Sequence, residues 1–554
     1  MRFGGNLCMI IVTCFIIMMA ASTLISTSPI TIIKPLEIGL AAKLPIFFWA
    51  GLLILGFLFY IGKESKYYLA IALILTILYL YVVPTLLKTS PSISPHSYYP
   101  FGESTLISST GHLIKRSATL ISYLYWPIFL YYASIFILLT GMSHHILLKY
   151  FPLLTIALYG LLVFLILRVK LKSSFSVYGT AWFLSSFFIR QHYFGPQGMA
   201  YIFFLLTLLL ISWIFFDRRF KKRILIALLF FLSIITVITH PLTTFMSLMV
   251  IIALYATHQI NYKRSSTTLI KLCLFLAVAF LSYNMFAAYG FFAESIQRYH
   301  NILLGMRTST IYKEPKRIIG STAFLINYAS SWSIVFLNGL IALITVFLAV
   351  KEGVIRKDYF SFYLITLITL SSFGLTAEYG SHEAYQRAFM FGLVPLSFFC
   401  VSLLSRKPKI LSTILVSLFL LNILAQYGSD TYRIVTESEL NGALFFAART
   451  PQKISVLYKF SPYIRYSNPL KQVKFLSLGT LPYTEVFDLA TINKAINETD
   501  YIIFSNLQDN YYIFYLGATP FQQIYWIYWD PCFIRIYDSG NFHIIGKSNV
   551  TISP

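Results

Sequence analysis

Long apolar runs separated by short polar segments fill the first 426 residues of the chain. Several runs approach or reach the roughly 20 apolar residues that a helix needs to cross a bilayer. The pattern therefore predicts an all-α polytopic bundle of about 13 transmembrane helices. The candidate spans lie near 7–26, 44–62, 67–87, 123–142, 151–168, 174–190, 197–216, 223–239, 241–258, 268–290, 325–350, 358–377, 388–404 and 410–426.

Three short basic loops, at 217–223, 351–357 and 406–409, predict which side of the membrane each loop occupies. Lys and Arg concentrate in cytoplasmic loops, so these three mark the inner face and the N-terminus lies with them. One early candidate then fails to cross. It is either 123–142, which is short and aromatic, or 174–190, which contains several Ser and Gly residues. The first run is expected to be a retained span, with a cleaved signal peptide as the alternative.

From Tyr427 onward the pattern changes to short aromatic and β-branched runs broken by turn residues. Such runs are typical of strands. Asp538-Ser-Gly-Asn541 between two of them predicts a hairpin, because glycine supplies the positive φ that tight turns need. We expect a transmembrane domain at 1–426 and a small extracytoplasmic α/β domain at 427–554.

Composition and charge support a plasma-membrane protein. The chain is 57% hydrophobic and 11% charged, with a formal net charge of +23. Residues 427–554 are neutral overall, so the whole excess lies in the short loops between apolar runs. Those cations are interpreted as topology signals, and a nucleic-acid partner is not expected. The five cysteines form no disulfide or metal-binding pattern.

The outer loop 88–122 contains a first group of residues suited to chemistry: His96, Tyr99, Glu103, Lys115 and Arg116. A carboxylate, a histidine and two cations at membrane level suit a lipid phosphate and a divalent metal such as Mg, Mn or Zn. The alternative is an interfacial loop whose aromatic residues only anchor it.

A second group lies in the outer loop that precedes the span at 197. Arg190 and His192, followed by Gln197, suit recognition of a phosphate or of sugar hydroxyls. His240, before Pro241 at a helix start, is a further binding candidate. Positively flanked loops and structural histidines are the alternatives.

A third group lies just before the span at 388. Arg387 is a candidate phosphate clamp, and Glu378 and Glu383 are candidate metal ligands or bases. The alternative for Glu383 and Arg387 is a simple ion pair, because the i,i+4 spacing places them on one helical face.

Several motifs together resemble the GT-C superfamily of polytopic membrane glycosyltransferases. They are Tyr125-Trp-Pro127 with Leu139-Thr-Gly141, Tyr193-Phe-Gly-Pro-Gln197, His240-Pro-Leu-Thr243 and the closing Arg535-Ile-Tyr-Asp-Ser-Gly-Asn-Phe542. The likeness is to family 39 and oligosaccharyltransferase-like proteins, especially archaeal members. It implies a sugar donor linked to a polyprenyl phosphate such as dolichyl phosphate, and use of that donor at the outer membrane face.

One departure bears on catalysis. The first outer loop of the family usually supplies an Asp, whereas this chain has no Asp before Asp217. An acceptor hydroxyl needs a base, so we expect Glu103 to replace that Asp, with His96 beside it. The resemblance implies transfer of a sugar to a surface lipid, glycan or protein. The alternatives are an inactive scaffold that binds lipid-linked glycan, and a transporter or flippase. The sugar, the acceptor and the oligomeric state do not follow from the sequence.

Overall fold

The structure is a computed structural model. It describes residues 2–27, 37–88, 94–113, 122–217, 221–263, 266–293, 296–297, 300, 321–353, 357–376, 380–404, 407–430, 433–450, 453–457, 472–476, 494, 496–516, 526–540 and 542–548.

The bundle is made of long apolar helices, ten of which, in the described ranges, are long and apolar enough to cross a membrane. Their counterparts in the sequence are the runs predicted above. The helices are α1 (Arg2–Ser26), α2 (Ile46–Ile61), α3 (Lys66–Ile77), α4 (Val83–Leu87), α5 (Tyr98–Thr110), α6 (Ile128–Thr140), α7 (His144–Arg168), α8 (Ser173–Ser186), α9 (Pro196–Phe216), α10 (Lys222–Thr239), α11 (Pro241–Tyr262), α12 (Thr267–Ser282), α14 (Thr322–Lys351), α15 (Asp358–Thr376), α16 (Gly380–Leu404) and α17 (Pro408–Tyr427).

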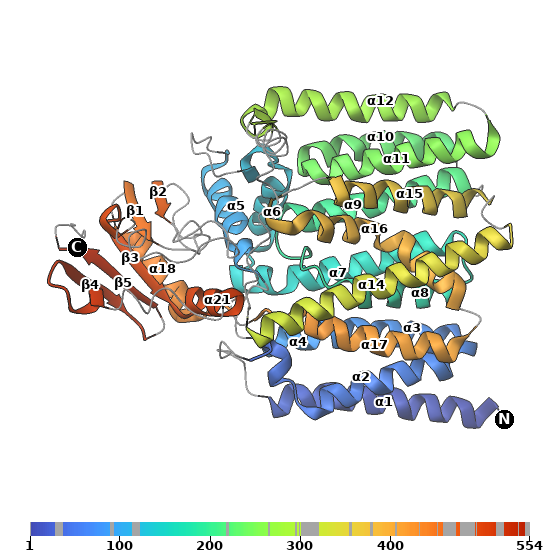
Figure 1. Ribbon diagram of the computed structural model, residues 1–554, viewed down its shortest axis with the longest axis horizontal. Helices are drawn as coiled ribbons and strands as arrows, with labels where there is room; N and C mark the ends of the chain where they lie inside the picture. Colours follow the sequence, from blue (N-terminus) through green and yellow to red (C-terminus); the bar gives the residue numbers. More distant parts are fainter. Residues whose placement is uncertain are drawn as a thin grey trace, which may run out of the picture.

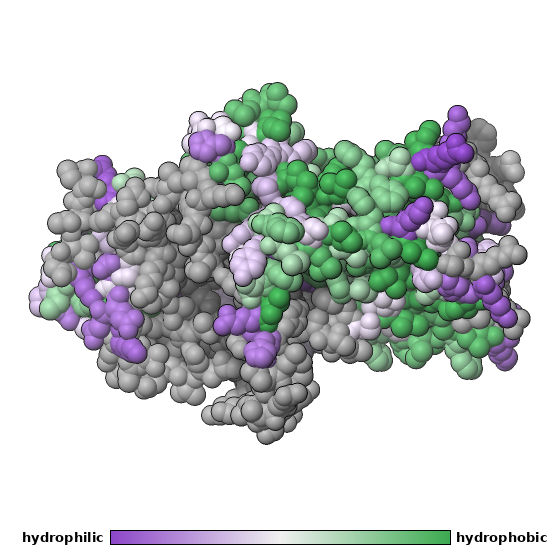
Figure 2. Space-filling model, turned by 90° about the horizontal axis from the view of Figure 1, so that it is seen from above, coloured by the Kyte–Doolittle hydropathy of each residue, from purple (hydrophilic) through white to green (hydrophobic). Residues whose placement is uncertain are grey.

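The long helices lie side by side, with the C-terminal domain at one end of the bundle and the N-terminus at the other (Figure 1). We call these the domain end and the N-terminal end. Figure 2 shows hydrophobic side chains along the flank of the bundle and hydrophilic ones gathered at the N-terminal end. This is the arrangement of a multi-pass membrane protein, as predicted.

The arrangement of the described helices favours 123–142 as the early candidate that does not cross. Its helix α6 has 13 residues and extends about 20 Å, which is short of a hydrocarbon core of about 30 Å. It packs on α5 at the domain end (Figure 1). The candidate 174–190 extends from one end of the bundle to the other, because α8 starts after α7 at the N-terminal end and Arg190 contacts Asp430 just beyond α17. Other helices surround α8, and every residue from Ser176 to Ser186 is buried.

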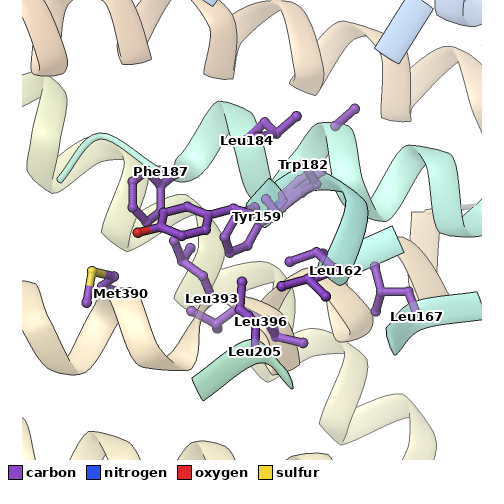
Figure 3. Close-up of a cluster of buried hydrophobic side chains, with 14 of the residues drawn as sticks. Tyr159, Leu162, Leu167, Trp182, Leu184, Phe187, Leu205, Met390, Leu393 and Leu396 are labelled. Carbon is purple, nitrogen blue, oxygen red and sulfur yellow. The ribbon is translucent and has the colours of Figure 1, made fainter. Parts of the chain in front are cut away.

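The centre of the bundle is an aromatic and aliphatic core where α7, α8, α9 and α16 meet (Figure 3). Tyr159 and Tyr201 are fully buried there with ring centroids 4.9 Å apart. Each hydroxyl donates to a backbone carbonyl, Tyr159 to Gly198 at 2.7 Å and Tyr201 to Met390 at 2.8 Å. Because a buried hydroxyl must be paired, these bonds set the positions of α7, α9 and α16 relative to one another.

Residues 88–122 are more than the aromatic, proline-interrupted loop that the sequence predicted. Helix α5 forms within it, and Tyr98 to Ser104 are all buried. Pro100 is accommodated because it lies in the first turn of the helix, where backbone N–H groups have no intrahelical partner.

The C-terminal domain holds a mixed five-stranded sheet of order β2-β1-β3-β5-β4. The strands are β1 (Lys453–Leu457), β2 (Gln472–Leu476), β3 (Tyr501–Ser505), β4 (Phe533–Asp538) and β5 (Phe542–Lys547), with helices α18 (Glu437–Arg449) and α21 (Asn506–Leu516). Strands β1, β2 and β3 are parallel, and β5 is antiparallel to β3 and β4. The predicted hairpin is β4–β5, with Gly540 at φ +77°.

A second core joins this domain to the bundle. Buried residues of α5 and α6, such as Phe101 and Phe129, belong to one cluster with Phe446 of α18 and Phe542 of β5. The cluster also includes Phe194, from the loop between α8 and α9. The core of the domain is therefore continuous with α5, α6 and the α8–α9 loop at the domain end of the bundle.

Candidate functional site

Three charged side chains meet at the domain end of the bundle. Asp430, just beyond α17, is fully buried and forms an ion pair with Lys88 at 2.7 Å. Its other oxygen accepts a hydrogen bond from Arg190 Nη1. Lys88 and Arg190 are 3% and 7% exposed. Two cations thus share a single carboxylate in a site from which water is largely excluded.

The aromatic ring of Tyr427 contacts both cations of this cluster. Its ring centroid lies 4.7 Å from Lys88 Nζ and 5.4 Å from Arg190 Cζ, which is within the range of cation–π attraction. Its hydroxyl donates to the Leu80 carbonyl at 2.7 Å. The tyrosine therefore connects the last helix of the bundle to the third, with both cations against its ring.

Arg433 and Lys149 add further positive charge. The charge of Arg433 is close enough to lower the pKa of both Lys88 and Arg190. Lys149 Nζ donates to the Lys88 carbonyl at 3.0 Å. Lys88 and Arg190 share the one carboxylate of Asp430, so these three side chains together carry an excess of positive charge.

The loop that carries Arg190 folds tightly onto the start of α9. Pro196 begins the helix, where proline is favoured. A Cβ atom on Gly198 would lie 2.7 Å from the Tyr193 carbonyl oxygen, so the close approach of the loop requires glycine. His192 packs against Tyr81 and Phe187, with ring centroids 5.6 and 5.9 Å apart. The sequence thus places Arg190 and His192 on a rigid turn.

Burial and neighbouring charge determine the protonation states. Burial, with Arg190 and Lys88 nearby, lowers the pKa of His192 to about 3, so its ring is neutral. Burial also lowers the pKa of Lys88 to about 8, although Asp430 opposes the shift. Burial alone would raise the pKa of Asp430, but Arg190 and Lys88 bring it below its ordinary value. Asp430 is therefore a persistent anion and a weak base.

A second polar contact joins α9 and α16 at the same end. Arg387 Nη1 donates to Gln197 Oε1 at 2.6 Å. Gln197 is 3% exposed, and among the described residues nothing accepts a hydrogen bond from its Nε2 or from Arg190 Nη2. Two buried donors therefore remain available to a ligand.

His240 lies close enough to Arg387 to be affected by its charge. Burial, and then this charge, lower the pKa of His240 to about 3. Its Nδ1 accepts a hydrogen bond from the Thr243 backbone N–H at 3.3 Å, which caps α11. That nitrogen has a structural role, which is the alternative given for His240 above.

The structure places three of the five candidate residues of 88–122. Glu103 is 1% exposed and Tyr99 is 6% exposed, both on α5. His96 is exposed, in the turn Pro95–Ser97. Glu103 takes no part in the Arg190–Asp430 and Arg387–Gln197 contacts. Lys115 and Arg116 lie outside the described residues.

The described side chains do not form a site that fits a divalent metal. No three His, Cys, Asp or Glu side chains come together among them. Of the candidate ligands, Glu378 and the side chain of Glu383 lie outside the described part of the chain. We therefore derive no chemical step through a metal.

The sequence reasoning missed Lys88, Asp430 and Tyr427. The predicted boundary at Tyr427 places Asp430 in the C-terminal domain, apart from the carboxylates of the membrane part. The sequence does contain a signal for two of these residues. Lys88 directly follows an apolar run, and only three residues separate Asp430 from the last predicted span. A charge at the very end of a span is a reasonable candidate for a site at that membrane face.

Comparisons with known proteins find a likeness among solved structures. No protein-family model matches the chain, and no curated protein matches it. Among solved structures it is similar to the crystal structure of ArnT from Cupriavidus metallidurans in the apo state. The identity is 10%, the match covers 82% of this chain and 94% of that chain, and the TM-score is 0.49. A likeness of this size says nothing about the reaction or its substrates.

Proposed function

We propose that this chain is a membrane glycosyltransferase of GT-C type whose donor is a sugar linked to a polyprenyl phosphate. The observation that carries the proposal is the buried excess of positive charge around Lys88, Arg190 and Asp430. Buried cations need compensating charge, and a phosphate supplies it with oxygens that match a guanidinium. The cluster lies just beyond the last residues of α4 and α17, which end on the side of the C-terminal domain (Figure 1).

The same charges suit the reaction. Transfer breaks the bond between sugar C1 and a phosphate oxygen and forms a new bond between C1 and an acceptor oxygen. Negative charge develops on the departing phosphate, and fixed cations in a water-poor site stabilise it. Gln197 Nε2 is placed to bind a sugar hydroxyl. The proton of the acceptor hydroxyl goes to a carboxylate, for which we propose Glu103 because Asp430 is tied to two cations.

The donor site is tested with the purified full chain and undecaprenyl phosphate. Binding should raise the melting temperature of the wild type. Arg190→Gln should weaken binding about 10-fold or more, because a charged hydrogen bond contributes roughly 1.5–3 kcal/mol. Arg168→Gln is the matched control, since Arg168 is exposed at the other end of α7.

A variant with the opposite expected sign separates binding from folding. Asp430→Asn removes the carboxylate that competes with the lipid phosphate, so the thermal shift produced by undecaprenyl phosphate should grow. A general loss of structure would reduce the shift in both variants. The proposal is wrong if Arg190→Gln binds like the wild type, or if Asp430→Asn loses the shift.

A second candidate function is a protein that binds lipid-linked glycan without transferring it. The ion-paired state of Asp430 favours it, because the carboxylate of the cluster is a weak base. The two functions differ in the effect of Glu103→Gln on release of polyprenyl phosphate from polyprenyl-phosphate glucose or mannose. An enzyme loses release while undecaprenyl phosphate still binds. A binder shows no release in the wild type.

A further inference from the structure

The C-terminal domain carries a cleft that the donor site does not use. It lies where β3 ends, beside the first turn of α21 and the β4–β5 hairpin, and has a volume of about 370 Å³. This is near the lower end of the size of small-molecule sites. Its lining residues are Phe504, Ser505, Asn506, Asp509, Tyr528, Trp529, Arg535, Gly540 and His543.

The apolar part of the lining is aromatic. Trp529 at the rim is 87% exposed, although a tryptophan usually buries most of its surface. Tyr528 packs on Phe504 with ring centroids 5.2 Å apart, and Arg535 Cζ lies 5.0 Å from the Tyr528 ring centroid. These contacts fix the orientation of Tyr528, whereas the ring of Trp529 faces solvent.

The polar part of the lining is held in place. Arg535 Nη1 donates to Asp538 Oδ2 at 2.9 Å, and His543 Nδ1 lies 3.0 Å from Asp538 Oδ1. Asn506 and Asp509 lie on the first turn of α21. The cleft therefore presents guanidinium, imidazole, amide and carboxylate groups beside an exposed aromatic ring.

We propose that this cleft binds the sugar rings of an oligosaccharide acceptor, a proposal that rests on the glycosyltransferase function above. A sugar ring has an apolar C–H face that packs on an indole ring, and neighbouring hydroxyls that pair with planar side-chain groups. A peptide is the poorer fit, because none of the described residues that line the cleft has an aliphatic side chain to form an apolar pocket. The domain would thus hold the glycan while the bundle supplies the donor.

The experiment measures binding of free oligosaccharides to the purified full chain by saturation-transfer NMR, with no donor present. The probes are di- to tetrasaccharides of glucose, mannose, galactose and N-acetylglucosamine. At least one should bind with a Kd of about 1 mM or tighter, and Trp529→Ala should weaken it about 10-fold. Trp529→Phe should restore much of the affinity.

The matched control is Trp526→Ala. Trp526 is 45% exposed in the same turn but does not line the cleft. Its substitution should leave sugar binding unchanged. The proposal is overturned if no probe binds the wild type, or if Trp529→Ala binds as well as Trp526→Ala. Neither result affects the undecaprenyl phosphate test, and failure of that test leaves sugar binding measurable, so the two proposals fail separately.

Discussion

Lys88 shows how one buried side chain can make the donor site sensitive to pH. Burial lowers its pKa to about 8, and a lipid phosphate is already a dianion at that pH because its second pKa is about 6. Above pH 8 the free site loses the Lys88 charge. Affinity for undecaprenyl phosphate is therefore expected to fall about 10-fold between pH 7.5 and 9.5.

Titration of binding by thermal shift across this range measures the effect. Lys88→Arg keeps its charge at every pH used, so its affinity should be nearly constant. Equal slopes for the wild type and Lys88→Arg would contradict the assignment of the pH dependence to Lys88.

Glu439 predicts a second pH effect, on stability. Its carboxylate accepts hydrogen bonds from the backbone N–H groups of Thr436 and Leu507, both at 3.0 Å, yet burial raises its pKa to about 7. An acid with a raised pKa stabilises the fold fully below its unfolded pKa of about 4.5, and this stability is lost as the pH rises through 7. The loss is on the order of 1–3 kcal/mol.

The melting temperature of the wild type should therefore fall from pH 5 to pH 8, and that of Glu439→Gln should fall less. Glu437→Gln is the control, because Glu437 is exposed on the same first turn of α18. If the melting temperature of Glu439→Gln falls with pH as steeply as that of the wild type, Glu439 is not the cause of the pH effect.

At the scale of elements, α6 is the helix whose position the sequence left open. Because α6 packs on α5 at the domain end (Figure 1), we expect both ends of α6 and all of α5 to lie on one side of the membrane. A membrane-impermeant maleimide added to intact cells should then label Ser109→Cys and Thr140→Cys, in a background where Cys532 is replaced by Ser. Lys170→Cys, at the N-terminal end, should react only after permeabilisation. All three positions are exposed.

The wild type provides the reference for this experiment, because Cys532 is exposed in the C-terminal domain. If Thr140→Cys reacts only after permeabilisation, as expected for Lys170→Cys, α6 crosses the membrane and the expected topology is wrong.

At the scale of the whole molecule, one aromatic cluster joins the C-terminal domain to the loop between α8 and α9. This loop carries Arg190 and is called the donor loop below. The Phe194 ring lies 4.9, 5.1 and 5.9 Å, between centroids, from the rings of Phe129, Phe151 and Phe101. Phe194→Ala is expected to cost about 3–5 kcal/mol of stability and to release the loop that carries Arg190. Affinity for undecaprenyl phosphate should fall with it.

Phe204→Ala separates stability from position. Phe204 is as buried as Phe194 but packs against Tyr201 and Phe391 in the centre of the bundle. The Phe204→Ala substitution should lower the melting temperature by a similar amount and leave the affinity for undecaprenyl phosphate unchanged. Equal affinities of the two variants would show that Phe194 does not position the donor loop.

The pattern of residues along the chain is sufficient to predict the membrane bundle, its apolar runs, the small C-terminal α/β domain and the β4–β5 hairpin. These features depend on local composition, because lipid requires long apolar helices and a tight turn requires a residue such as Gly540. Basic loops such as 217–223 lie between those runs, so the sequence also predicts which loops share a side of the membrane.

Which charged side chains meet depends on how the helices pack in three dimensions. Lys88, Arg190 and Asp430 are far apart in the chain, and their contact depends on how α4, the α8–α9 loop and α17 pack. Periodicity predicts that a helix forms but not which neighbour it packs against, so it leaves such long-range pairs open. Periodicity also leaves open which of α6 and α8 crosses the membrane. Helix α8 contains Ser and Gly residues, and it can lie within the bundle because other helices bury it.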